Sequence, residues 1–118
     1  MNIVNVQFIK GINETVIPEI RLTRSRTGST GTATFRFKNP SVLKIDISNK
    51  QLISGLYLID QEGTLLTKTL DVKFLNGKPL IIEAIYVIKT TNEWERLMRF
   101  LTRYSDKNKL TFIKADKN

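Results

Sequence analysis

The sequence contains no cysteine and no histidine. A chain without cysteine forms no disulfide and presents no thiol nucleophile, and a Cys/His zinc site is excluded. Without histidine the chain also lacks the side chain that usually titrates near neutral pH. We therefore expect no metal site of this type and no histidine-based catalytic triad.

Long apolar runs are also lacking. A transmembrane helix needs about 20 consecutive apolar residues, whereas Glu83 interrupts the apolar stretch 80–88. The first residues show neither a secretory signal nor the Arg- and Ser-rich pattern of a transit peptide. We expect a chain that begins close to Met1 and has no membrane-spanning helix.

Alanine is scarce, with 3 residues against 14 Ile, 12 Lys and 9 Asn. Ile, Lys and Asn have AT-rich codons and alanine has GC-rich ones, so this bias is typical of an AT-rich genome. A plastid genome is one example among many.

A clustered set of carboxylates is missing as well. The 11 Asp and Glu residues are scattered along the chain, and Asp60 and Glu62 fall in a predicted turn that explains them structurally. The stretch 28–31 has no P-loop spacing. We therefore expect no enzyme, no cofactor and no small-molecule substrate.

At 118 residues the chain is long enough for one domain, which we expect to span 1–118. Its formal charge of +8 is uneven, because segments 20–38 and 96–118 each carry +5 and the segments 1–19 and 39–95 each carry −1. Such a distribution favours an acidic partner, whether nucleic acid, an anionic membrane surface or an acidic protein face.

The first basic segment, 20–38, has the pattern of a β-hairpin. Ile20 and Leu22 alternate with polar residues before a turn-rich linker, 27–31, and Ala33, Phe35 and Phe37 alternate after it. This period of two predicts a strand pair with one apolar face and one cationic face. Gly28 and Gly31 can supply positive φ in the turn.

Three further strands follow from residue 55 onward. The sequence predicts strands at 56–59, 66–74 and 80–88, joined by a turn at 60–63 and by Asn76-Gly77, a strong signal for a two-residue hairpin turn. The last of these strands is apolar on both faces, so we place it in the middle of a sheet. The whole stretch is predicted to be a three-stranded meander.

A helix is predicted from Asn92 to about Tyr104, with Asn92 as N-cap and Glu95 completing a capping box. The apolar side chains form one arc, which we expect to pack on the sheet. Arg96, Arg99 and Arg103 fall on the opposite side, where the simplest expectation is a solvated face.

Three further elements are predicted. They are a first strand at 4–8, a short strand or irregular crossing at 41–54, and an edge strand around Leu110 and Phe112.

An RNA-binding module is the alternative from another functional class. Segment 31–37 resembles the aromatic strand of an RNA-recognition motif, without the leading Lys/Arg-Gly-aromatic element. Phe35 and Phe37 share a face with Ala33, so periodicity favours core packing. Exposed rings would support RNA binding and buried rings would oppose it.

Several segments together resemble one family, the small photosystem II assembly factors described as photosystem II reaction centre W-type proteins of cyanobacteria and plastids. The resemblance covers about residues 6–114 and is carried by Phe8-Ile9-Lys10-Gly11, Glu14, 18–22, Arg24-Ser25-Arg26, Gly28, Gly31, Ala33, Phe35, Phe37, 55–60, Glu62-Gly63, 74–79, 94–100 and Arg103-Tyr104. Segment 39–53 matches least.

The resemblance implies a non-catalytic, extrinsic protein on the stromal or cytoplasmic side of the thylakoid membrane. Its partners would be core antenna and reaction-centre subunits of assembly intermediates, and partner segments would extend its sheet. The codon bias favours a plastid protein, with a cyanobacterial one as alternative.

We combine these inferences into an α+β domain in which an antiparallel sheet, built from the basic hairpin and the meander, packs against one main C-terminal helix. The residues expected to bind the partner are Arg21, Arg24, Arg26, Thr32, Thr34, Arg36, Lys38, Arg99 and Arg103.

Overall fold

The structure is a computed structural model that describes residues 3–44, 53–109 and 113–116. Its elements are β1 (Val4–Gln7), β2 (Glu19–Arg24), β3 (Gly31–Lys38), a 3₁₀ turn η1 (Ser41–Lys44), β4 (Leu56–Asp60), β5 (Gly63–Thr67), β6 (Leu70–Leu75), β7 (Lys78–Ile88), α1 (Thr91–Asn108) and β8 (Ile113–Asp116). The α+β class is confirmed.

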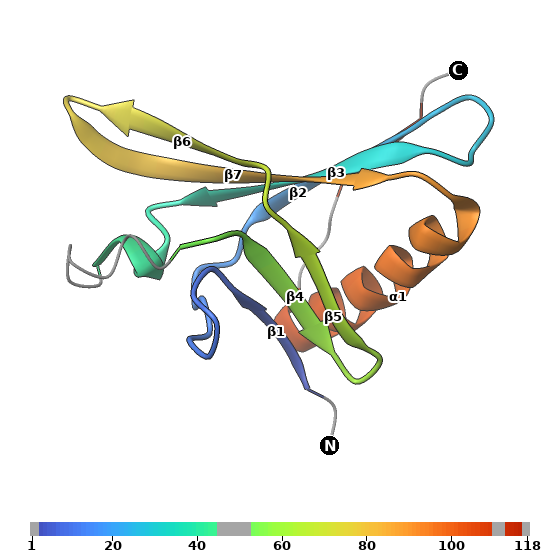
Figure 1. Ribbon diagram of the computed structural model, residues 1–118, viewed down its shortest axis with the longest axis horizontal. Helices are drawn as coiled ribbons and strands as arrows, with labels where there is room; N and C mark the ends of the chain where they lie inside the picture. The colour runs from blue at the N-terminus through green and yellow to red at the C-terminus, as the bar shows by residue number, and fades with distance from the viewer. Residues whose placement is uncertain (1–2, 45–52, 110–112, 117–118) are drawn as a thin grey trace.

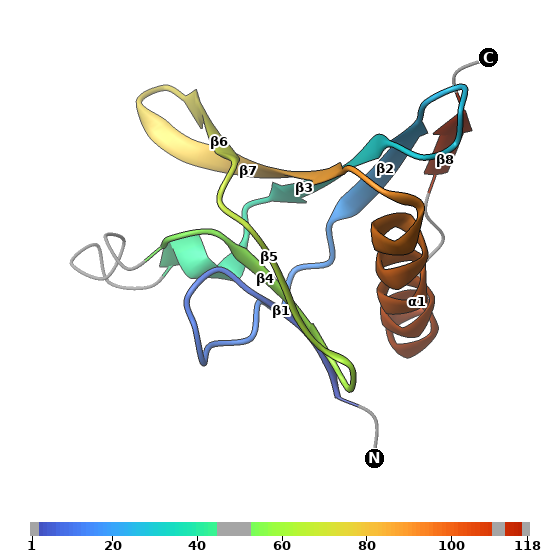
Figure 2. The same cartoon turned by 45° about the vertical axis from the view of Figure 1, so that its right-hand side comes forward.

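The strands form two sheets rather than one. The larger sheet has the order β6-β7-β3-β2-β8 and the smaller has the order β1-β4-β5. Figure 1 shows the larger sheet crossing above the smaller one, and Figure 2 shows the smaller sheet and α1 side by side beneath it. One side of the larger sheet is therefore covered, and no described element covers the other.

The basic hairpin is confirmed. β2 and β3 pair antiparallel, with Ile20 opposite Phe35 and Leu22 opposite Ala33. Gly28 has φ of 78° in the turn, as expected. Gly31 instead begins β3, where a Cβ atom would lie 2.3 Å from the Thr23 carbonyl oxygen, so its small size permits close strand contact rather than a positive φ.

The predicted three-stranded meander is wrong. β4 and β5 belong to the smaller sheet and β6 and β7 to the larger one, so the strand predicted at 66–74 is two strands. The chain turns a corner at 67–69, where the Thr67 hydroxyl donates to the Ile85 carbonyl and the Thr69 carbonyl accepts from the Ile85 N–H. The Asn76-Gly77 turn is confirmed, with φ of 52° and 78°.

Helix α1 begins earlier and ends later than predicted. Its N-cap is Thr90, whose hydroxyl accepts from the Glu93 N–H at 3.1 Å, and the Glu93 carboxylate accepts from the Lys89 N–H at 2.8 Å. The capping arrangement thus lies two residues before the predicted one. The helix continues to Asn108 and closes on Lys109 in a left-handed conformation.

The remaining predictions have mixed outcomes. The first strand is confirmed, while 41–44 forms a 3₁₀ turn and 45–52 lies outside the described residues. The last strand does lie at a sheet edge, but it runs parallel to β2 and its predicted residues Leu110 and Phe112 lie outside the described part.

One hydrophobic core unites both sheets and the helix. Buried residues of β1, β2, β3, β4, β7 and α1 form a single cluster. Phe8, just after β1, meets Phe37 of β3 edge to face at 4.8 Å, which ties the two sheets together. The predicted apolar arc of α1 supplies Trp94, Leu97 and Phe100 to this core.

Candidate functional site

Five of the nine residues expected to bind a partner share the outward side of the larger sheet. They are Arg21 of β2 and Thr32, Thr34, Arg36 and Lys38 of β3. Their strand neighbours Leu22, Ala33 and Phe35 are fully buried, so alternation along the strands points the five side chains away from the core.

We call this side the open face and define it by three cross-strand rows from β7, β3 and β2. The rows are Val87–Thr32–Thr23, Ile85–Thr34–Arg21 and Glu83–Arg36–Glu19. The strand pattern predicted that this side of β7 would be buried. The prediction holds only in part: Ile81 is 9% exposed and therefore buried, whereas Val87 is 52% exposed, because nothing described packs above it.

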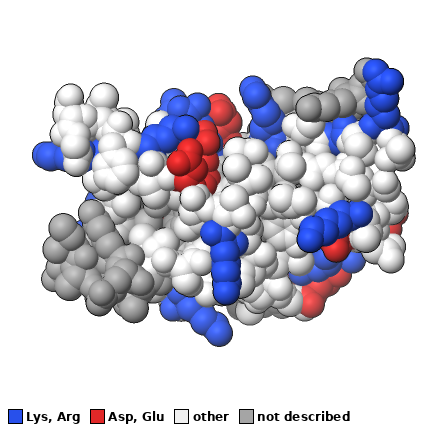
Figure 3. All heavy atoms as spheres, turned by 45° about the horizontal axis from the view of Figure 1, so that its top comes forward, with Lys and Arg blue, Asp and Glu red and all other residues white. Residues whose placement is uncertain are grey.

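Charge on the open face is balanced at one end and basic elsewhere. Arg36 lies 3.6 Å from the Glu83 carboxylate, and Lys73 of β6 lies 3.8 Å from the same carboxylate and 3.2 Å from Asp71. Figure 3 shows red and blue atoms adjoining above this part of the sheet, with isolated blue atoms beyond it. Arg21 and Lys38 are exposed and form no ion pair with any described residue.

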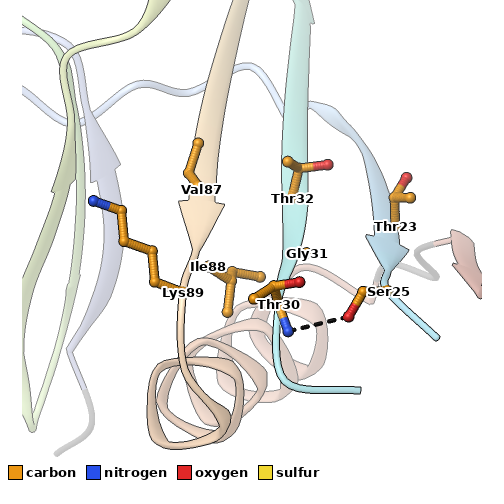
Figure 4. Close-up of a pocket in the computed structure, with 8 residues that line it drawn as sticks. All are labelled: Thr23, Ser25, Thr30, Gly31, Thr32, Val87, Ile88 and Lys89. Carbon is orange, nitrogen blue, oxygen red and sulfur yellow. Dashed lines mark hydrogen bonds between the residues drawn. The ribbon is translucent and has the colours of Figure 1, made fainter. Parts of the chain in front are cut away.

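A shallow hollow of about 420 Å³ lies at the other end of the open face. Figure 4 shows that Val87, Thr32 and Thr23 lie on three neighbouring strands, with Gly31 below them in the view. Gly31 contributes only backbone to the lining, because a Cβ atom there would point to the other side of the sheet, toward Trp94, and Lys89 lines one end. The hollow offers apolar methyl groups, hydroxyls and one cation, a surface that suits an extended chain or a side chain of another protein.

Arg24 faces the other side of the sheet. Its guanidinium lies 4.5 Å from the centre of the Trp94 ring, and its Nε donates to the Gly28 carbonyl at 3.0 Å. These contacts fasten the hairpin tip to the first turn of α1 by a cation–π interaction. Arg26 lies in the turn beyond β2.

Arg99 and Arg103 belong to an ionic cluster with Arg96 and the β4–β5 turn. Arg96 and Arg103 donate to the fully buried carboxylate of Asp60 at 2.7–2.9 Å. Arg99 and Arg103 contact the Glu62 carboxylate at 2.6–2.9 Å. The arginine side of α1, expected to be solvated, thus pairs with two acidic side chains that the sequence assigned only to a turn.

The cluster shifts the acidity of both carboxyl groups. Burial alone would raise the pKa of Asp60, but hydrogen bonds from Arg96 and Arg103 outweigh it and lower that pKa. Hydrogen bonds from Arg99 and then Arg103 lower the pKa of Glu62 from 4.5 to about 2. Both groups are therefore ionised at neutral pH, and the cluster fastens α1 to the smaller sheet.

The RNA-binding alternative has no support in the structure. Phe35 and Phe37 are fully buried, so the hairpin presents no rings on which bases can stack.

Among the described residues no three Asp, Glu, Cys or His side chains gather as metal ligands. No helix in the part of the chain that the structure describes is both long and apolar enough to cross a bilayer.

Sequence comparison relates the chain to one family. The family model described as Psb28 protein matches residues 6–112. The "Photosystem II reaction center Psb28 protein" of Gracilaria tenuistipitata var. liui is 57% identical over 110 residues, covering 93% of this chain and 96% of that protein. The protein of the same name from Nostoc punctiforme is 52% identical over 112 residues, covering 95% and 97%.

Proposed function

This chain belongs to the Psb28 family of photosystem II proteins, which occurs in plastids and cyanobacteria, and from that membership we propose that it is a non-catalytic assembly factor. In this proposal it binds assembly intermediates of photosystem II from the stromal side of the thylakoid membrane, or from the cytoplasmic side in a cyanobacterium, and assists biogenesis or repair. The family that the sequence resemblance describes as W-type is the Psb28 family.

The observation that carries the proposal is the match to the family over nearly the whole chain. The open face supports it physically. No described element covers it, and it carries hydroxyls, a few apolar side chains and cations that have no ion pair among the described residues, which suits a protein partner. We propose that core antenna or reaction-centre subunits contact this face, with Arg21 and Lys38 meeting acidic side chains of the partner.

The edges of the sheets support a second mode of contact. β6 pairs only with β7, and β5 pairs only with β4, so each leaves one row of backbone groups without a strand among the described residues. β1 is also an edge strand, but its Val4 and Val6 carbonyls already accept from the Lys107 ammonium and the Glu14 N–H. An extended partner segment would complete such an edge by β-augmentation. Side-chain pairing on the open face and backbone pairing at an edge are compatible in one complex.

The test is affinity capture from detergent-solubilised thylakoids with tagged protein, in which the wild-type chain is expected to recover photosystem II subunits. The double variant Arg21→Ala/Lys38→Ala removes two exposed cations that have no ion pair among the described residues. We expect recovery to fall about fivefold to tenfold at low salt and to converge with wild type at high salt, because exposed charges are screened.

The matched control is Lys10→Ala/Lys68→Ala, which removes the same charge from exposed positions that lie outside β2, β3 and β7. Equal recovery by the two double variants would remove the open face from the proposal. Wild-type protein that captures only the mature complex, judged by native gels, would contradict a role in assembly.

A further inference from the structure

The β6–β7 hairpin ends in large apolar side chains that the core does not use. Phe74 is 64% exposed, Leu75 is 58% exposed and Val72 is 39% exposed. Adjacent surface residues of this kind are unusual on a protein that contacts only water. The hairpin also extends away from the body of the molecule, as Figures 1 and 2 both show.

The tip is apolar on both of its faces. Val72 and Phe74 line a hollow of about 410 Å³ on the inner side of the sheet, together with Leu43 and Ile82. Leu75 follows Phe74 directly in the same strand, so it points to the opposite side. A groove on a protein would satisfy one face of such a hairpin, whereas an apolar medium that surrounds the tip would satisfy both.

The end of the hairpin carries lysines, and its acidic residues Asp71 and Glu83 lie opposite each other farther back along the strands. Residues 72–82 include Lys73 and Lys78 and no acidic residue. Lys73 is partly balanced by Asp71 and Glu83, while Lys78 is exposed and has no ion pair among the described residues. Lys44, exposed on the turn η1 beside the hollow, adds a further cation. The apolar tip is therefore bordered by lysines, which anionic headgroups attract.

We propose that the β6–β7 hairpin tip binds directly to the surface of an anionic lipid bilayer. Phe74 and Leu75 enter the boundary between headgroups and acyl chains, and Lys78 and Lys44 remain at the level of the headgroups. Segments that lie at that boundary typically bury Phe and Leu, and each nearby lysine strengthens binding to anionic lipid about fivefold, equivalent to about 1 kcal/mol. The protein then holds to the membrane by its own surface, independently of any protein partner.

Vesicle flotation of the purified full-length protein tests this proposal. Vesicles of phosphatidylcholine alone are compared with vesicles of equal parts phosphatidylcholine and phosphatidylglycerol. We expect binding to the anionic vesicles, a loss of at least tenfold in Phe74→Ser/Leu75→Ser, and a loss of about fivefold in Lys78→Ala. The controls are Val87→Ser, which is also exposed and apolar, and Lys89→Ala.

Insertion is measured with a fluorescent reporter at the tip. Phe74→Trp adds a second indole to the single buried Trp94, which serves as an internal reference. We expect a blue shift of the added indole with anionic vesicles, and quenching by lipids brominated on the acyl chains. Val87→Trp is expected to show neither effect.

Three results would overturn the proposal. The first is no binding to anionic vesicles by a wild-type protein that still captures photosystem II subunits, which leaves the proposed function intact. The second is equal vesicle binding by Phe74→Ser/Leu75→Ser and wild type. The third is a pair of results: wild type does not bind vesicles, and Phe74→Ser/Leu75→Ser no longer captures photosystem II subunits in detergent. That outcome would assign the tip to a protein contact.

Discussion

At the scale of the residue, Glu14 shows how one side chain can fix a connection between distant segments. Glu14 is 8% exposed, and its carboxylate accepts hydrogen bonds from the Val16 N–H, the Ser41 N–H and hydroxyl, and the Val42 N–H, at 2.6–3.0 Å. It thereby caps the turn η1 and joins it to the loop after β1. Local sequence carries no sign of this burial, since three of the four donor groups belong to Ser41 and Val42, which are 27 and 28 positions away.

We predict that Glu14→Gln lowers the free energy of unfolding by about 1–3 kcal/mol, because an amide has one acceptor oxygen where the carboxylate has two, and buried N–H donors lose their partner. Urea unfolding followed by circular dichroism measures this change. Glu19→Gln, at an exposed position of β2, is the control and should cost less than about 0.5 kcal/mol. Equal effects of the two substitutions would contradict the role assigned to Glu14.

At the scale of the element, the ionic cluster fixes α1 against the β4–β5 hairpin. The sequence shows both halves of the cluster. One is a turn that contains Asp60 and Glu62, and the other is a stripe of arginines along one side of the helix. Their pairing was not predictable, because they are 36–43 residues apart and only the packing of the helix beside the smaller sheet brings them together. Arg99 and Arg103 thus have partners within the chain, and their contact with another protein stays a prediction.

We predict that Asp60→Asn destabilises the protein by about 2 kcal/mol, because Arg96 and Arg103 lose the charge that balances them while remaining largely covered. Their side chains are 16% and 25% exposed, so water compensates for part of the loss. Chemical denaturation provides the measurement. Asp71→Asn, which breaks a surface pair whose carboxylate is 58% exposed, should change stability by less than about 0.5 kcal/mol. A smaller cost for Asp60→Asn than for Asp71→Asn would contradict the assignment.

The split of the predicted meander has a similar origin. Leu66, Leu70, Val72 and Phe74 do repeat with a strand-like period, so local pattern alone reads as one long strand. The break at 67–69 is stabilised by hydrogen bonds to the backbone of Ile85. That residue belongs to β7, which follows later in the chain. Periodicity reports which side of a strand is apolar and carries no information on which sheet the strand joins.

At the scale of the whole molecule, the two carboxyl groups of the cluster make stability depend on pH in the acid range. Their ordinary pKa values of 3.8 and 4.5 are lowered in the folded protein, to about 2 for Glu62. The unfolded chain therefore binds more protons than the folded chain below these values. The resulting stabilisation is complete above the ordinary values and is lost as the pH falls toward about 2.

We predict that the urea midpoint is nearly constant from neutral pH down to about pH 5 and falls steadily below it. Glu62→Gln should flatten that fall, because the titrating group that Arg99 and Arg103 stabilise has been removed. Glu95→Gln, which alters an exposed carboxylate of the same helix, should leave the slope as in wild type. An acid profile in Glu62→Gln identical to that of wild type would show that the cluster is not its cause.

Local sequence is enough to predict the basic hairpin, its buried phenylalanines, the apolar arc of the helix, the Asn76-Gly77 turn and the family. All of these depend on local periodicity, turn chemistry or residue identity, which neighbouring residues fix. Three features come from long-range packing alone: the division into two sheets, the exposure of Val87 where no described element covers β7, and the ion pairs of the helix arginines. Each of these depends on which distant segments meet, and burial against a distant segment leaves no mark in local spacing.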